Sequence, residues 1–103
     1  MALNSLPFSV RELACRQPSG WVDAKSLAAN VAKTFNIPLG AKYVVFSSTS
    51  NFYVMAGGAA AVPGDVTDGT ASELNPSMLM IEAYTTIGVI SPAASVVTAS
   101  YYI

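Results

Sequence analysis

The sequence contains no histidine. This absence excludes Ser-His-Asp and Cys-His catalysis, and it removes the commonest general base and the commonest zinc ligand. Only one cysteine is present, so no internal disulfide can form, and we expect Cys15 to be a small buried hydrophobe. No spacing of a nucleophile with a base stands out elsewhere. We therefore expect a protein that is not an enzyme and needs no cofactor.

Charged residues are scarce as well. They make up 11% of the 103 residues, against about 25% in an average soluble domain. Two stretches, residues 43–64 and 83–103, carry no charge at all. Since interspersed charges usually keep a monomer's surface soluble, this composition indicates a surface that is partly buried against a partner. The alternative is that alanine, serine and threonine cover the surface of a monomer adequately.

The composition disfavours two kinds of partner. The formal net charge is −1 and the five basic residues are spread along the first half of the chain, so there is no basic patch for nucleic acid. Serine, threonine, glycine and proline interrupt both uncharged stretches, so neither forms the apolar span of about 20 residues that crosses a membrane. We expect neither a nucleic-acid nor a membrane partner.

Alternation of apolar with other residues dominates the chain and predicts short β-strands. The predicted strands cover residues 26–37, 42–48, 52–56, 78–84, 85–91 and 94–103, with one more over residues 8–16. An alanine-rich helix over residues 26–34 is the alternative for the first of them. Seven or eight short strands separated by turn signals predict an all-β fold, an antiparallel β-sandwich or a jelly-roll-like barrel. Residues 1–103 form one domain, in which residues 1–25 are a candidate extended arm.

Between the predicted hairpin of residues 43–56 and the next strand lies a long loop, residues 56–76, rich in glycine, proline and polar residues. Asp65, Asp68 and Glu73 fall within nine residues of it. Carboxylates on a flexible loop are ligands that calcium uses, but Asp-Gly is also ordinary turn chemistry, and the spacing does not match an EF-hand. The turn interpretation is preferred, and no metal site is expected.

Aromatic residues give the other candidates for contact. Tyr101 and Tyr102 are neighbours in a predicted strand, so one of them faces outward and is available to a partner. Trp21 is either a lid on the core or an exposed anchor. With Val62 and Pro63 of the long loop, these residues are the candidate interface residues.

The segment "IPLGAKYVVFSSTSNFYVMAGGAAAVPGDVTDGTASELNPS" resembles small virion proteins of tailed bacteriophages. In that pattern an aromatic-rich hairpin precedes a Val-Pro, Asp-x-x-Asp-Gly, Ser-Glu-Leu-Asn-Pro loop, and apolar alternating strands follow. The resemblance covers roughly residues 26–103. It implies a minor capsid, cement or decoration protein that assembles as a homotrimer on the major capsid protein, located in the virion after assembly in the host cytoplasm. A β-sandwich module that binds a glycan or calcium, such as a tail or fibre component, is the alternative.

Overall fold

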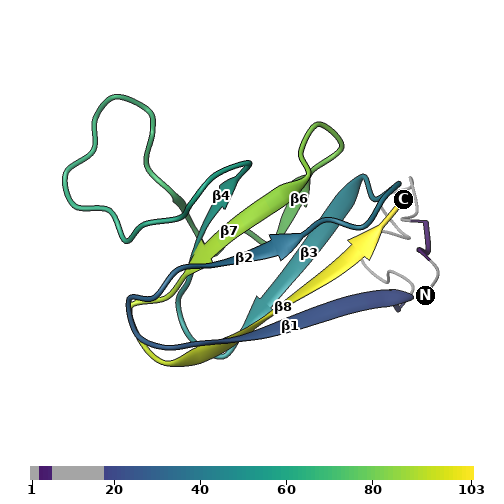
Figure 1. The fold of residues 1–103 in the computed structure, drawn as a ribbon, viewed down its shortest axis with the longest axis horizontal. Coiled ribbons are helices and arrows are strands. Elements are labelled where there is room, and N and C mark those ends of the chain that lie inside the picture. Colours follow the sequence, from purple (N-terminus) through teal and green to yellow (C-terminus); the bar gives the residue numbers. More distant parts are fainter. Residues whose placement is uncertain (1–2, 6–17) are drawn as a thin grey trace.

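Two antiparallel sheets of four strands pack face to face in the computed structural model, which describes residues 3–5 and 18–103 (Figure 1). Sheet A has the order β1-β8-β3-β6, and sheet B has the order β2-β7-β4-β5. The strands are β1 (Trp21–Leu27), β2 (Lys33–Asn36), β3 (Tyr43–Ser48), β4 (Tyr53–Ala56), β5 (Glu73–Leu74), β6 (Met78–Met80), β7 (Thr86–Ile90) and β8 (Ser95–Tyr102). The predicted all-β sandwich is therefore confirmed.

The core lies between the two sheets, where alternate residues of the strands meet. Sheet A contributes Val44 and Phe46 of β3 with Val97, Ala99 and Tyr101 of β8, and sheet B contributes Phe35, Val54, Ile87 and Val89. Each of these side chains is nearly or fully buried. Because side chains alternate between the faces of a strand, the intervening residues of β3 and β8 face away from the core.

The expected single strand over residues 26–37 is interrupted, although residues 33–36 do form a strand, and the alternative helix over residues 26–34 is wrong. β1 ends at Leu27 and β2 begins at Lys33, and the two strands belong to different sheets. Asn30 turns the chain between them with a φ of 60°, a left-handed conformation that asparagine tolerates better than most residues. Its backbone N–H donates to the carbonyl of Ser91 at 2.7 Å, which fixes the turn against the end of β7.

The predicted hairpin of residues 43–56 is also wrong, although both of its strands exist. β3 pairs with β6 and β8, whereas β4 pairs with β5 and β7 in the opposite sheet. The connection has no glycine for the tight turn that favours a two-residue hairpin, and it carries the chain across the core instead. Phe52 is buried in this crossing, with its ring centroid 5.7 Å from that of Phe46.

The remaining predicted strands are confirmed in shorter form. β6 covers only three residues of the predicted 78–84, because the backbone turns at Ile81, whose carbonyl accepts from the N–H of Tyr84 at 3.0 Å. Residues 21–25 of the candidate arm form part of β1, and Asn4 bridges Tyr102, whereas residues 1–2 and 6–17 lie outside the described residues. Cys15 and the predicted strand over residues 8–16 lie outside the described residues.

Candidate interaction surface

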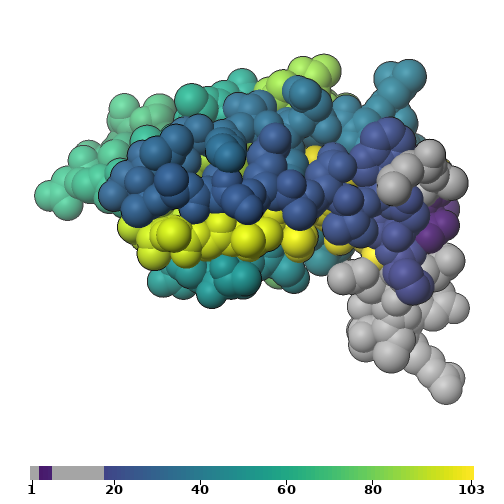
Figure 2. All heavy atoms as spheres, turned by 60° about the horizontal axis from the view of Figure 1, so that its bottom comes forward, coloured from purple at the N-terminus to yellow at the C-terminus, as the bar shows by residue number. Residues whose placement is uncertain are grey.

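The outer face of sheet A carries no charged side chain. We call this surface the neutral face; its members are Val22, Ala24 and Ser26 of β1, Val96, Thr98 and Ser100 of β8, Tyr43, Val45 and Ser47 of β3, and Met78 and Met80 of β6. In the space-filling view, the yellow residues of β8 form a continuous band across the surface beside the blue residues of β1 (Figure 2). The low charge content of the chain thus appears in the structure as one sheet face, four strands wide, without charged side chains.

The register aligns these side chains in rows across the strands. Val22 pairs with Ser100, Ser100 with Val45, and Val45 with Met78, so these four residues form one row over all four strands. The β1 margin holds the small side chains of Val22, Ala24 and Ser26, and the central strands hold small or branched side chains apart from Tyr43. The β6 margin holds the long methionines, of which Met80 is 69% exposed. The face is therefore low along the β1 margin and raised along the β6 margin.

The outer face of sheet B differs because the chain covers part of it. Gly88, in the central strand β7, is fully buried, and a β-carbon placed there would collide with the backbone of Gly58 and Ala60. The base of the long loop is held down at this point. The N–H of Ala61 donates to Oγ of the buried Ser72 at 3.1 Å, which ties the outgoing and returning ends of the loop together.

Beyond this clamp, residues 61–71 project from the end of the sandwich, as the green loop shows in Figure 1. Val62 and Val66 of the projection are exposed, and Pro63 is half-buried. A loop that is fixed at its base and presents apolar side chains at its tip is suited to contact with another molecule. Val62 and Pro63, two of the candidate interface residues, lie in this projecting segment.

The structure does not gather the acidic residues of this loop. Asp65, Asp68 and Glu73 are all exposed, and no three acidic or cysteine side chains form a group that could hold a metal ion anywhere in residues 3–5 and 18–103. Oδ1 of Asp68 accepts from Oγ1 of Thr70 at 2.6 Å and from its N–H at 3.1 Å. These hydrogen bonds, the one from the side chain first, lower the pKa of the Asp68 carboxyl below its ordinary value. The turn interpretation accounts for Asp68.

Two of the three aromatic candidates are buried, and the third, Trp21, is partly buried. Tyr101 and Tyr102 are both fully buried, so the expectation that one of them meets a partner is wrong. Tyr101 points into the core, as its place in β8 requires, and burial together with the charge of Asp23 raises the pKa of its hydroxyl. Tyr102 lies on the outer side of β8, but at the end of the strand where Asn4 pairs with it. Trp21 packs against the core cluster and is the lid rather than an exposed anchor.

At the β1 edge of sheet A, charge reappears. Asp23 and Lys25 lie on the inward side of β1, in line with Leu27, and they help to line a small polar hollow with Phe35 and Asn36. Nζ of Lys25 lies 5.6 Å from the centre of the Phe35 ring, within the range of a cation–π contact. Inward-pointing charges on an edge strand hinder another strand from pairing there, because the added strand would bury them.

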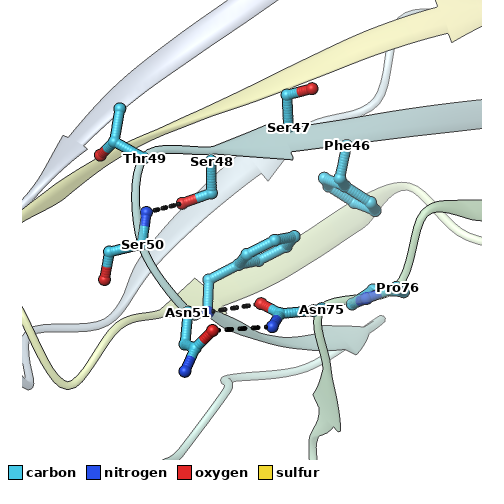
Figure 3. A pocket seen from close by; sticks show the side chains of 9 residues that line it. Phe46, Ser47, Ser48, Thr49, Ser50, Asn51, Asn75 and Pro76 are labelled. Carbon is cyan, nitrogen blue, oxygen red and sulfur yellow. Dashed lines mark hydrogen bonds between the residues drawn. The ribbon is translucent and has the colours of Figure 1, made fainter.

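At the turn after β3, a hollow of about 390 Å³ is lined by serine, threonine and asparagine side chains (Figure 3), together with Phe46, Phe52 and Pro76. Much of this polar lining is already engaged. Oδ1 of Asn75 accepts from the N–H of Phe52, and its Nδ2 donates to Oδ1 of Asn51, both at 2.9 Å. Asn75 thus joins the connection between β3 and β4 to the end of β5.

A third hollow opens between the two short edge strands β5 and β6. It measures about 290 Å³ and is lined mainly by apolar side chains, among them Met55, Leu79, Met80 and Tyr84, with Glu73 as its only charge. This hollow adjoins the methionine margin of the neutral face. Apolar exposure thus continues from the neutral face around one side of the sandwich.

No protein-family model, curated protein or solved structure matches the chain. In the part of the chain that the structure describes, no helix has the length and apolar character needed to cross a membrane. The neutral face was not predicted from the sequence, although the residues that form it alternate there. Val96, Thr98 and Ser100 alternate with Val97, Ala99 and Tyr101, and because both sets are uncharged, alternation alone does not say which set faces out.

Proposed function

We propose that this protein is a structural component of a bacteriophage virion, of the cement or decoration type, which works by burying surface against copies of itself and against the capsid lattice. The observation that carries the proposal is the neutral face, a whole sheet surface without a charged residue. The resemblance of residues 26–103 to small virion proteins supplies the biological setting. No turnover is part of this function.

The physical basis is the low cost of removing such a face from water. Buried apolar surface contributes roughly 25 cal/mol per Å², and removing ionised groups from water carries a penalty of several kcal/mol per ion that this face avoids. Its serine and threonine hydroxyls need partners when buried, and some have them already, since Oγ1 of Thr98 donates to the carbonyl of Ser47 at 3.3 Å. Burial of the neutral face is therefore favourable without a matching set of charges on the partner.

The projecting loop supplies the second contact in this proposal. Residues 61–71 extend away from both sheets, and Val62 and Val66 present apolar tips. We assign to this loop the contact with the capsid lattice, while copies of the chain meet through other surfaces. The homotrimer expected from the resemblance belongs to this proposal as one form of self-association.

The first test is mass spectrometry of purified virions of the phage that encodes the chain. The protein is expected in the virion at many copies, and its absence would overturn the proposal. A second arm adds purified protein to capsids that lack it and measures the temperature at which they release DNA. A variant in which a short Gly-Ser linker replaces residues 62–70 should fold but fail to bind, whereas Val31→Ala, in the turn after β1, should bind normally.

The second candidate function is recognition of a neutral glycan by the hollow in Figure 3. Its uncharged hydroxyl and amide lining over two aromatic residues favours a sugar over any charged ligand. Calorimetric titration with neutral oligosaccharides tests this candidate. Heat that is lost in Asn51→Ala but kept in Asn36→Ala, on the far sheet, would establish it, and the absence of heat with the wild-type protein would end it.

A further inference from the structure

We propose that the neutral face pairs with the neutral face of a second copy, so that two chains stack sheet A against sheet A about a two-fold axis running along the strands. This inference deepens the proposed function, because it names the partner of one surface. It rests on three features of the face: its charge, its relief and its size.

The absence of charge on the neutral face favours a second copy of the chain as its partner. In a two-fold contact the same patch meets itself, so every charge on the patch meets a copy of the same sign. The neutral face has none, whereas the projecting loop carries Asp65 and Asp68 and would repel its own copy. A polyanion, an anionic lipid surface or a strongly charged protein gains nothing from a face without charge. A second copy meets no electrostatic cost there.

The relief of the face selects the direction of the axis. Met78 and Met80 raise the β6 margin, while Val22, Ala24 and Ser26 keep the β1 margin low. An axis along the strands places the methionines of one copy over the small residues of the other. An axis across the strands would instead place the β6 methionines on each other and the small residues of β1 on each other, leaving a wedge-shaped gap between sheets that pack about 10 Å apart.

The size of the face sets the strength expected of the pair. Its eleven residues compare with roughly 20–30 residues per partner in a standard stable interface. The contact is therefore at the lower end of the range, and we expect a reversible dimer that dissociates on dilution. Edge-to-edge pairing of sheet A is a poorer alternative. The edge strand β6 has only three residues, and Asp23 and Lys25 hinder pairing at the edge of β1.

The test uses one substitution at two positions that have the same exposure. Val22, on the neutral face, and Val31, in the turn after β1, are both 48% exposed. Light scattering across a concentration series should give the wild type and Val31→Lys twice the 10.7 kDa chain mass at high concentration. Val22→Lys should raise the dissociation constant at least 10-fold, because the stacked copy would bury an unpaired ammonium group. A chain-mass wild type at every concentration, a mass of three chains, or equal behaviour of the two variants would each overturn the inference.

A mixing experiment tests the axis and guards against loss of folding. In the stacked pair, the row that joins Val22 to Met78 places each of these residues over the other in the second copy. Val22→Lys and Met78→Glu should each be monomeric alone and should form a one-to-one heterodimer when mixed, since the two introduced charges then meet. Failure of the mixture to associate would overturn the arrangement. If the chain is monomeric in solution but present in virions, the proposed function stands and the stacked dimer is refuted. If the chain forms the dimer but is absent from virions, the dimer stands and the proposed function is refuted.

Discussion

Gly88→Ala is the substitution that tests most directly how the projecting loop is anchored. The φ of Gly88 is not in the left-handed region, so the backbone accepts alanine without strain. The obstacle is space: the added β-carbon would lie 2.8 Å from the nitrogen of Ala60, 3.2 Å from the carbonyl carbon of Ala59, and in closer collision with the oxygen of Gly58. All three are backbone atoms, which cannot rotate away as a side chain does.

Either the loop base lifts off sheet B or β7 shifts within the core. Overpacking of this kind typically costs about 1–3 kcal/mol, and we expect a loss of about 2 kcal/mol in the free energy of unfolding. In a domain of this size, that loss lowers Tm by roughly 8–16 °C. If the loop lifts, Ala60, now only 5% exposed, becomes accessible, and proteolysis within residues 57–72 should accelerate.

Urea unfolding followed by tryptophan fluorescence, with Trp21 as the only probe, measures the change. Gly64→Ala is the matched control: nothing lies within 4 Å of its added carbon and its φ is not left-handed, so its stability should be unchanged or slightly raised. If Gly88→Ala matched the wild type in both unfolding midpoint and proteolysis rate, the close approach of the loop base to β7 would be refuted.

Three further outcomes are expected. Asn75→Ala should lower the free energy of unfolding in urea by about 2–3 kcal/mol, because the N–H of Phe52 loses its acceptor and alanine disfavours the φ of 47°; Asn75→Gly should lose only the hydrogen-bond part. Thr70→Val should raise the pKa of Asp68, followed by NMR, toward its ordinary value; since the folded-state pKa is lowered, this carboxylate stabilises the fold above its unfolded pKa, and the effect is lost as the pH falls through the folded pKa. Tyr101→Phe should fold at least as stably as the wild type at pH 7, because the buried hydroxyl has no hydrogen-bond partner among the described residues. Because burial raises the pKa of this tyrosine, the wild type should lose stability above about pH 10, where the unfolded chain ionises first, and Tyr101→Phe should lose less.

Alternation along single strands was enough to predict the class of fold. Val97, Ala99 and Tyr101 share one face of β8, as their spacing indicates, and Val44 and Phe46 share one face of β3; the structure shows that both faces meet the core. What alternation does not contain is the partner of each strand. β1 pairs with β8 across 68 to 80 residues of sequence, and no local signal marks that pairing, so the division of strands between the two sheets was not predictable.

The errors at the candidate site have a related cause. A break between β1 and β2 depends on Asn30 entering a left-handed turn against Ser91, which is a contact distant in sequence. The exposure expected of Tyr101 or Tyr102 followed from strand geometry alone, whereas the structure buries both side chains although they lie on opposite sides of β8. Local patterns describe which side of a strand a residue occupies, and tertiary contacts decide whether that side meets solvent.

The positions of the charged residues indicate how copies of the chain associate, which their small number alone does not. The eight charged residues of the described part are Asp23, Lys25, Lys33, Lys42, Asp65, Asp68, Glu73 and Glu82, and none lies on the neutral face. Two of them, Asp23 and Lys25, guard the longest edge strand of sheet A, so a second copy cannot extend the sheet there without burying them. Growth of a continuous sheet is open-ended, whereas stacking of two identical faces is closed once each face is covered. A guarded edge beside an uncharged face thus directs association toward the stacked pair and away from aggregation.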